Sequence, residues 1–128
     1  MTNLTTRLVY LVDALGSAAL GVLLIVLADP LADLFGAGLP RIALLIVGVG
    51  LLPWAAFNLW IARRSVHPRG AANLNVIGDI GWIVASIALV LMAPLTALGV
   101  LAVTAIGAFV LAVCVTKLMG LRNRPLLA

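Results

Sequence analysis

Four long runs of apolar residues, separated by short polar segments, fill most of the chain. Each run has about the twenty residues that an α-helix needs to cross the hydrocarbon core of a bilayer. The runs lack the continuous polar face that a surface helix of a soluble protein keeps. The pattern predicts an all-α polytopic membrane protein, a four-helix antiparallel bundle that forms one domain over residues 1–128. The expected transmembrane helices are Leu8–Ala28, Ile42–Ala62, Ala72–Met92 and Ala97–Met119.

The two connections on one side of this bundle differ in length. The segment Asp29–Pro40 is long enough for a short interfacial helix between transmembrane helices 1 and 2, with Asp29 as its N-cap and Pro30 as its first residue. Gly36 would end this helix. The segment Ala93–Thr96 predicts a tight turn, so the third and fourth transmembrane helices should be antiparallel neighbours.

The charged residues set the orientation. Hydrophobic residues make up 65% of the chain and charged residues 9%, with a net charge of +4. Seven basic residues fall on the side of the termini and one, Arg41, on the other, and cytoplasmic loops carry this excess. We therefore expect a bacterial inner membrane protein with cytoplasmic termini, in contact with the lipid bilayer and not with nucleic acid. Anionic lipid head groups should bind Arg63, Arg64, Arg69, Arg122 and Arg124.

Two of the four acidic residues lie inside apolar runs, Asp13 in the first and Asp79 in the third. Counting turns from the cytoplasmic boundary places both at a depth of about 8–10 Å. Carboxylates at such depth usually face the bundle interior and pair, so we expect these two to face each other. Helical spacing puts other polar or aromatic side chains beside them, and the expected ligand or proton site comprises Asp13, Asp79, Asn75, Asn58, Trp54, Trp82, Ser17 and Lys117.

This polar layer admits more than one interpretation. Two neighbouring carboxylates can share a proton and exchange it for a cationic ligand, which Trp54 and Trp82 would attract through their rings. The same layer can instead hold the helices together by interhelical hydrogen bonds, with the tryptophans as bulky filler. Lys117 could pair with an Asp, which would favour ionised carboxylates, or extend to the head groups.

The residues needed for catalysis are sparse. The chain has no Glu, one His and one Cys, so a metal centre, a haem site or a Ser–His arrangement lacks partners. His67 lies beside three arginines, which would repel a metal ion. We therefore expect no enzyme activity, no catalytic residues, no metal and no cofactor.

Three segments carry a resemblance to the small four-helix integral membrane proteins of bacteria: Leu11–Ser17, Leu52–Ala56 and Trp82–Ser86. The general plan is similar to that of the small multidrug resistance transporters, which have four helices and an essential acidic residue in helix 1. That resemblance implies that Asp13 is the site for a proton or a drug cation. The chain departs from those transporters in having Asp in place of Glu, a second acid in helix 3 and the long segment Asp29–Pro40.

Two functions remain as hypotheses from the sequence. The first is proton-coupled transport or ligand binding through the buried Asp pair. The second is a non-catalytic structural or accessory subunit of a membrane complex, whose surface could hold a hydrophobic small molecule. In either case the small residues of the helices favour a homo-oligomer or another membrane protein as partner.

Overall fold

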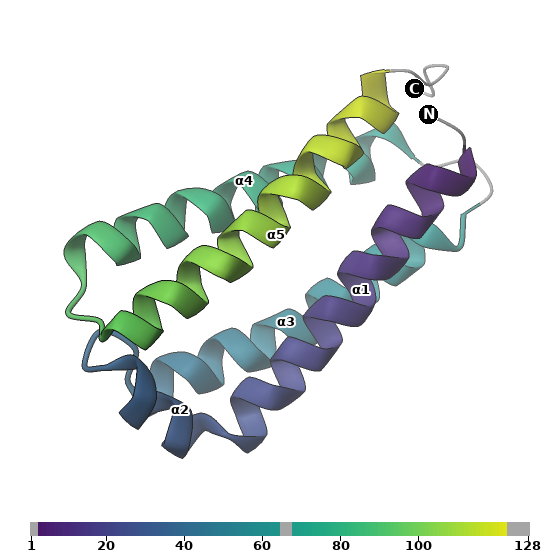
Figure 1. The fold of residues 1–128 in the computed structure, drawn as a ribbon. Helices are drawn as coiled ribbons and strands as arrows, with labels where there is room; N and C mark the ends of the chain where they lie inside the picture. The colour runs from purple at the N-terminus through teal and green to yellow at the C-terminus, as the bar shows by residue number, and fades with distance from the viewer. Residues whose placement is uncertain (1–2, 65–67, 123–128) are drawn as a thin grey trace.

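The computed structural model describes residues 3–64 and 68–122, which form five helices (Figure 1). The long helices are α1 (Asn3–Val26), α3 (Arg41–Ala62), α4 (Arg69–Met92) and α5 (Ala97–Arg122), and α2 (Ala28–Phe35) is short. All four long helices are long and apolar enough to cross a membrane, which confirms the predicted all-α, four-span architecture and makes the chain a small multi-pass membrane protein.

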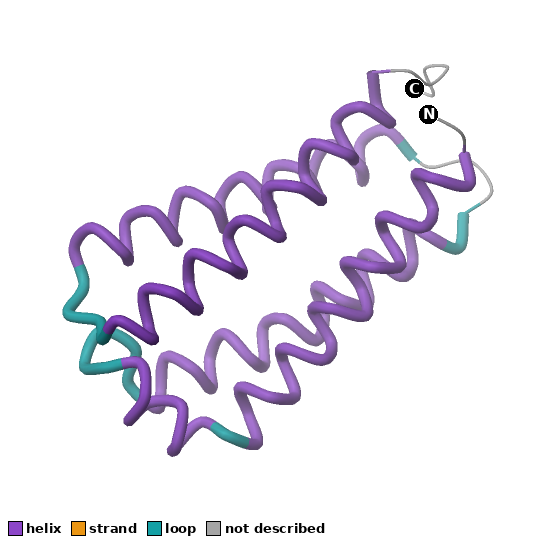
Figure 2. The backbone as a smooth tube through the Cα atoms, viewed as in Figure 1, coloured by secondary structure: helices purple, strands orange, loops and turns teal. Residues whose placement is uncertain are grey.

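Three of the four long helices extend beyond the predicted runs at the end that carries the termini. There α1 begins at Asn3, α4 begins at Arg69 after Pro68, and α5 continues to Arg122. Hydropathy marks the apolar part of a helix, whereas backbone hydrogen bonding continues through the polar residues on either side of it. Figure 2 shows the long helices as continuous coils, α3 included, although Pro53 lies inside it.

The bundle consists of two hairpins. Helices α1 and α3 pack closely along their length, as do α4 and α5, and fewer contacts join one hairpin to the other (Figure 1). Gly21 and Gly48 make the first hairpin tight, because a Cβ on either would lie 2.9 Å from the other's carbonyl oxygen. Buried positions of α3 recur every three or four residues, at Leu44, Gly48, Leu51, Ala55 and Asn58.

The short helix and the 93–96 turn join the hairpins at the end opposite the termini. The backbone N–H of Gly38 donates to the Pro94 carbonyl, and that of Thr96 donates to the Phe35 carbonyl, each at 3.0 Å. The expected short helix is present, but its predicted cap is wrong. Leu27 occupies the N-cap, and Asp29 lies in the first turn, where its carboxylate pairs with Arg41 at 2.7 Å. The helix begins at Ala28, two residues earlier than predicted, so Asp29 lies within it and its exposed carboxylate is free to pair with Arg41.

Candidate functional site: a buried ion cluster beside a cavity

Lys117 of α5 is the centre of a buried polar cluster to which all four long helices contribute. Its ammonium nitrogen lies 2.5 Å from Asp13 Oδ2 and 2.8 Å from Asp79 Oδ2. It also donates to the side-chain oxygens of Asn75, at 2.5 Å, and Asn58, at 3.1 Å. Its side chain is 0% exposed, so these four oxygen atoms replace the hydration shell that the ammonium would have in water.

The two asparagines position the ion cluster through further hydrogen bonds. Asn75 Nδ2 donates to Asn58 Oδ1 at 3.2 Å, which links α4 to α3. Asn58 Nδ2 in turn donates to the backbone carbonyl of Trp54, one turn earlier in α3. Both amides are fully buried, and their remaining polar atoms face the ammonium. The orientation of Lys117 is therefore fixed by neutral groups as well as by charges.

The cluster carries one formal negative charge when both carboxylates are ionised, because two aspartates surround one lysine. Removing one partner of a buried ion pair typically costs about 3–5 kcal/mol, since the remaining charge is left without compensation. The cluster links the hairpin of α1 and α3 to that of α4 and α5 at this end. It also leaves one negative charge that a proton or a cation could neutralise.

The structure brings six of the eight predicted site residues into this cluster. Ser17 joins it by donating to Asp13 Oδ1 at 3.1 Å. Asp13 and Asp79 both accept from Lys117, so they are not a carboxylate pair without a cation partner. Trp54 contributes its backbone carbonyl, and the rings of Trp54 and Trp82 lie beside the cluster along a cavity.

Sequence reasoning missed Tyr10, which is buried and whose ring centroid lies 4.9 Å from the Lys117 nitrogen. This geometry is a cation–π contact. The signal was present in the spacing, because Thr6, Tyr10, Asp13 and Ser17 share one face of α1 and all are buried.

A cavity of about 570 Å³ lies between the hairpins, next to the ion cluster. All four long helices line it, and most of the lining is apolar. Asp13, Asp79 and Ser17 form its polar part, whereas Lys117 does not line it. A molecule in this cavity would therefore meet the carboxylate side of the cluster.

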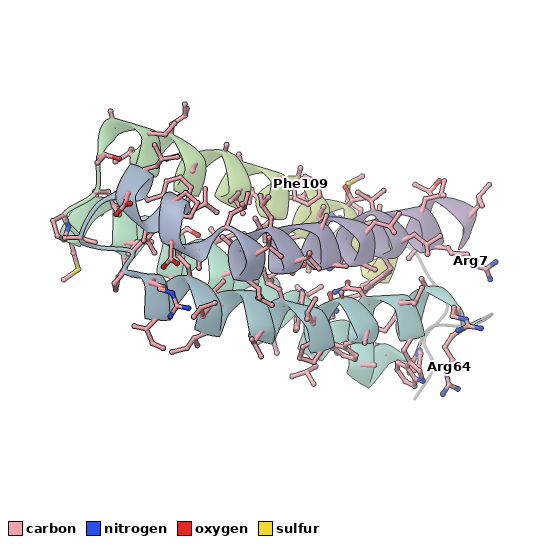
Figure 3. The ribbon with its side chains drawn as sticks, turned by 90° about the horizontal axis from the view of Figure 1, so that it is seen from below. Arg7, Arg64 and Phe109 are labelled. Atoms are coloured by element: carbon pink, nitrogen blue, oxygen red, sulfur yellow. The ribbon has the colours of Figure 1, made fainter. Side chains whose placement is uncertain are left out.

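An aromatic residue packs against a glycine on each side of this cavity. Where the hairpins meet at α1 and α5, the Phe109 ring lies 3.5 Å from the place where a Gly16 Cβ would be. Where they meet at α3 and α4, the Trp54 ring occupies the space that a Cβ on Gly78 would need. Phe109 is 41% exposed and lies about midway along the molecule (Figure 3).

Trp82 reaches across from α4 and packs against the core that α1 and α3 form around Leu24 and Leu51. Its indole Nε1 is buried and has no hydrogen-bond partner among the described residues. An unpaired buried N–H typically costs about 1–3 kcal/mol. The polar side chains of the ion cluster, in contrast, have hydrogen-bond partners. Trp82 also lines a second, apolar cavity of about 240 Å³ closer to α2.

The basic residues with described side chains at the end of the termini lie on the surface, apart from Lys117. Arg7, Arg63, Arg64, Arg69 and Arg122 are exposed, and Figure 3 shows Arg7 and Arg64 at the same end of the molecule. The Arg64 guanidinium lies 4.3 Å from the Trp60 ring centroid. Arg124 and His67, which the sequence also singled out, lie outside the described residues.

The chain matches no family model, no curated protein and no solved structure. Within residues 3–64 and 68–122, no three His, Cys, Asp or Glu side chains are grouped so that they could hold a metal ion. The function has to be argued from the ion cluster and the cavity alone.

Proposed function

We propose that this protein binds a hydrophobic cation, taken from the bilayer, in the cavity between its two hairpins. The observation that carries the proposal is the asymmetry of the ion cluster: Asp13 and Asp79 line the cavity, and Lys117 does not. A cationic group in the cavity would neutralise the unpaired negative charge at a depth where charge is costly. Trp54 and Trp82, which also line the cavity, would attract the same group through their rings.

A proton and a cationic ligand would compete at this site. Either one can neutralise the extra carboxylate, and both together would leave the cluster with a positive charge. Binding of the cation therefore favours release of a proton into the surroundings. That competition is the property required for exchange of protons against cations across a membrane, and it supports proton-coupled transport as the use of the site.

A structural or accessory role is the second candidate, favoured by the saturation of Lys117. Four side chains from three helices surround its ammonium, and the contacts between hairpins are otherwise few. In this role the cluster maintains the packing of the hairpins while the exposed apolar faces contact a partner membrane protein. The cavity then has no ligand of its own.

Binding of tritiated dodecyltrimethylammonium to the protein in lipid nanodiscs distinguishes the two roles, with empty nanodiscs as the background. Gly50 lines the cavity and has open space around its Cβ position, so Gly50→Leu should place an apolar side chain in part of the cavity without a clash. Gly81 also has open space but does not line it, so Gly81→Leu is the matched control. We expect saturable binding that Gly50→Leu removes and Gly81→Leu retains. Absence of saturable binding, or equal binding by both variants, would contradict the proposal.

A further inference from the structure

A groove on the outer surface of the bundle lies at the end of α3 that is near the termini. It has a volume of about 280 Å³ and shares no lining residue with the two cavities described above. This α3 groove is lined by Ala56, Leu59, Trp60, Arg63 and Arg64. All five are exposed, so the groove opens to the surroundings of the protein.

The α3 groove has an apolar part and a cationic part. Ala56, Leu59 and Trp60 share one face of a helix that is apolar enough to cross the membrane, and the two arginines follow directly after its last residue. Tryptophan is enriched where the hydrocarbon meets the head groups, which places the arginines at head-group level. A molecule in the groove would therefore have its apolar part beside Leu59 and its polar part beside the guanidinium groups.

Aromatic contacts position Arg64 within the groove. Its guanidinium lies over the Trp60 ring, 4.3 Å from the centroid, and the Trp60 ring stacks with that of Phe57 at 6.4 Å between centroids. Within residues 3–64 and 68–122, the side chains of Arg63 and Arg64 make no hydrogen bond or ion pair. Their N–H donors are therefore available to a bound molecule.

The carboxylates of the described residues all lie away from the groove. Asp13 and Asp79 bind Lys117 inside the bundle. Asp29 and Asp33 belong to α2, at the end opposite the termini (Figure 1). The two arginines thus have no counter-ion in the described part of the chain, and the charge of the groove is complementary to an anion from outside.

We propose that the α3 groove binds an anionic phospholipid, with the phosphate at Arg63 and Arg64 and an acyl chain beside Leu59 and Ala56. The guanidinium N–H groups match the oxygens of a phosphate in geometry and charge. A zwitterionic lipid brings a second, cationic group, which the two arginines repel. Lipids whose head group adds no cation, such as phosphatidylglycerol, are therefore preferred. This site is separate from the cavity of the proposed function and does not depend on it.

Native mass spectrometry of the protein in a neutral detergent gives the affinity for the first bound lipid. Dioleoyl phosphatidylglycerol and dioleoyl phosphatidylcholine have the same chains, so the ratio of their affinities reports on the head group. The double variant Arg63→Gln with Arg64→Gln removes the cationic part of the groove. The matched control is Arg7→Gln with Arg122→Gln, which removes two exposed arginines at the same end of the molecule but outside the groove.

We expect Arg63→Gln with Arg64→Gln to lower the ratio, phosphatidylglycerol over phosphatidylcholine, by at least about fivefold, the contribution of one arginine near the head groups. The control should retain most of the wild-type ratio. Equal losses in the two double variants would indicate a diffuse attraction of all the basic residues and would overturn the proposal. An unchanged ratio in Arg63→Gln with Arg64→Gln would also overturn it.

A second pair of variants tests the apolar part of the groove. Ala56→Leu places a larger side chain where the acyl chain should lie and leaves every charge in place, so it should weaken binding of phosphatidylglycerol. Ala88→Leu, at an exposed position of α4 outside the groove, should have no such effect. Unchanged binding in Ala56→Leu would contradict this placement of the chain. Deacylated glycerophosphoglycerol that competes as well as the lipid itself would assign the arginines to a soluble anion and would overturn the lipid site.

Discussion

Lys117 and Asp13, 104 residues apart in the chain, meet at 2.5 Å in the interior of the bundle. One belongs to α5 and the other to α1, so this contact joins the first long helix to the last. Asp79 of α4 accepts from the same ammonium at 2.8 Å. The contact with Asp13 therefore joins the two hairpins, whereas the contact with Asp79 lies within the second hairpin.

The first prediction is that Lys117→Met destabilises the fold more than any neutralisation of an acid. Without the ammonium, Asp13 and Asp79 remain buried as two like charges with no compensating cation. We expect a loss of about 3–5 kcal/mol in the free energy of unfolding. Denaturant unfolding in mild detergent, followed by circular dichroism, provides the measurement.

The matched control is the triple variant Lys117→Met with Asp13→Asn and Asp79→Asn. It removes all three charges together, and a neutral cluster of similar volume should recover most of the stability that Lys117→Met loses. A triple variant no more stable than Lys117→Met alone would show that packing, and not charge, determines the stability of this layer.

Much of this architecture could be predicted from the sequence, because each segment that spans the hydrocarbon core must meet strict requirements with its own residues. A run such as Ala97–Met119 has to be a spanning helix, since every backbone polar group must be satisfied within it. The cost of charge at depth likewise predicted that Asp13 and Asp79 face the bundle interior, where both are buried. In both cases the free-energy cost of exposing an unsatisfied polar group or a charge to lipid exceeds any effect of neighbouring helices.

The features that could not be predicted depend on the relative rotation of helices. The sequence does not decide whether Lys117 reaches an Asp or the head groups, because the ammonium of this long flexible side chain finds a partner in either place. Two such features are the contact between Gly78 and Trp54 and the separation of Lys117 from the cavity. Their prediction would require the rotation of each helix about its own axis. Hydropathy is insensitive to that angle in helices that are apolar on nearly all faces.

The second prediction concerns Gly78, whose missing side chain leaves room for the Trp54 ring. Gly78→Ala should displace that ring and disturb the junction of α3 and α4, where the hairpins have few other contacts. We expect a loss of about 1–3 kcal/mol, in the range of overpacked cores. The same unfolding measurement on Gly81→Ala, where a Cβ meets open space, should show little change. Similar losses in both variants would indicate a general effect of helix glycines and not this contact.

The third prediction concerns orientation, which follows from the excess of basic residues near the termini. In a Cys114→Ala background, Ala37→Cys, at an exposed position between α2 and α3, should react with a membrane-impermeant maleimide on intact cells. Gly70→Cys, at the opposite end of the bundle, should react only after lysis. The reverse pattern would place the termini outside and would contradict the orientation predicted from the basic residues.

The last prediction tests competition between protons and cations through the charge count of the cluster. Dodecyltrimethylammonium keeps its charge at every pH, so any pH dependence of its binding has to come from the protein. Two carboxylates facing one ammonium leave one negative charge, which a proton neutralises in the empty site and the ligand neutralises in the occupied one. The affinity should therefore rise with pH, by at most about tenfold per unit when one proton is released for each ligand bound.

The variant Asp79→Asn removes the extra charge and leaves Asp13 paired with Lys117, so its weaker binding should be nearly independent of pH. A wild-type affinity that stays constant while binding is saturable would show that ligand and proton do not share the site, and would leave binding without exchange.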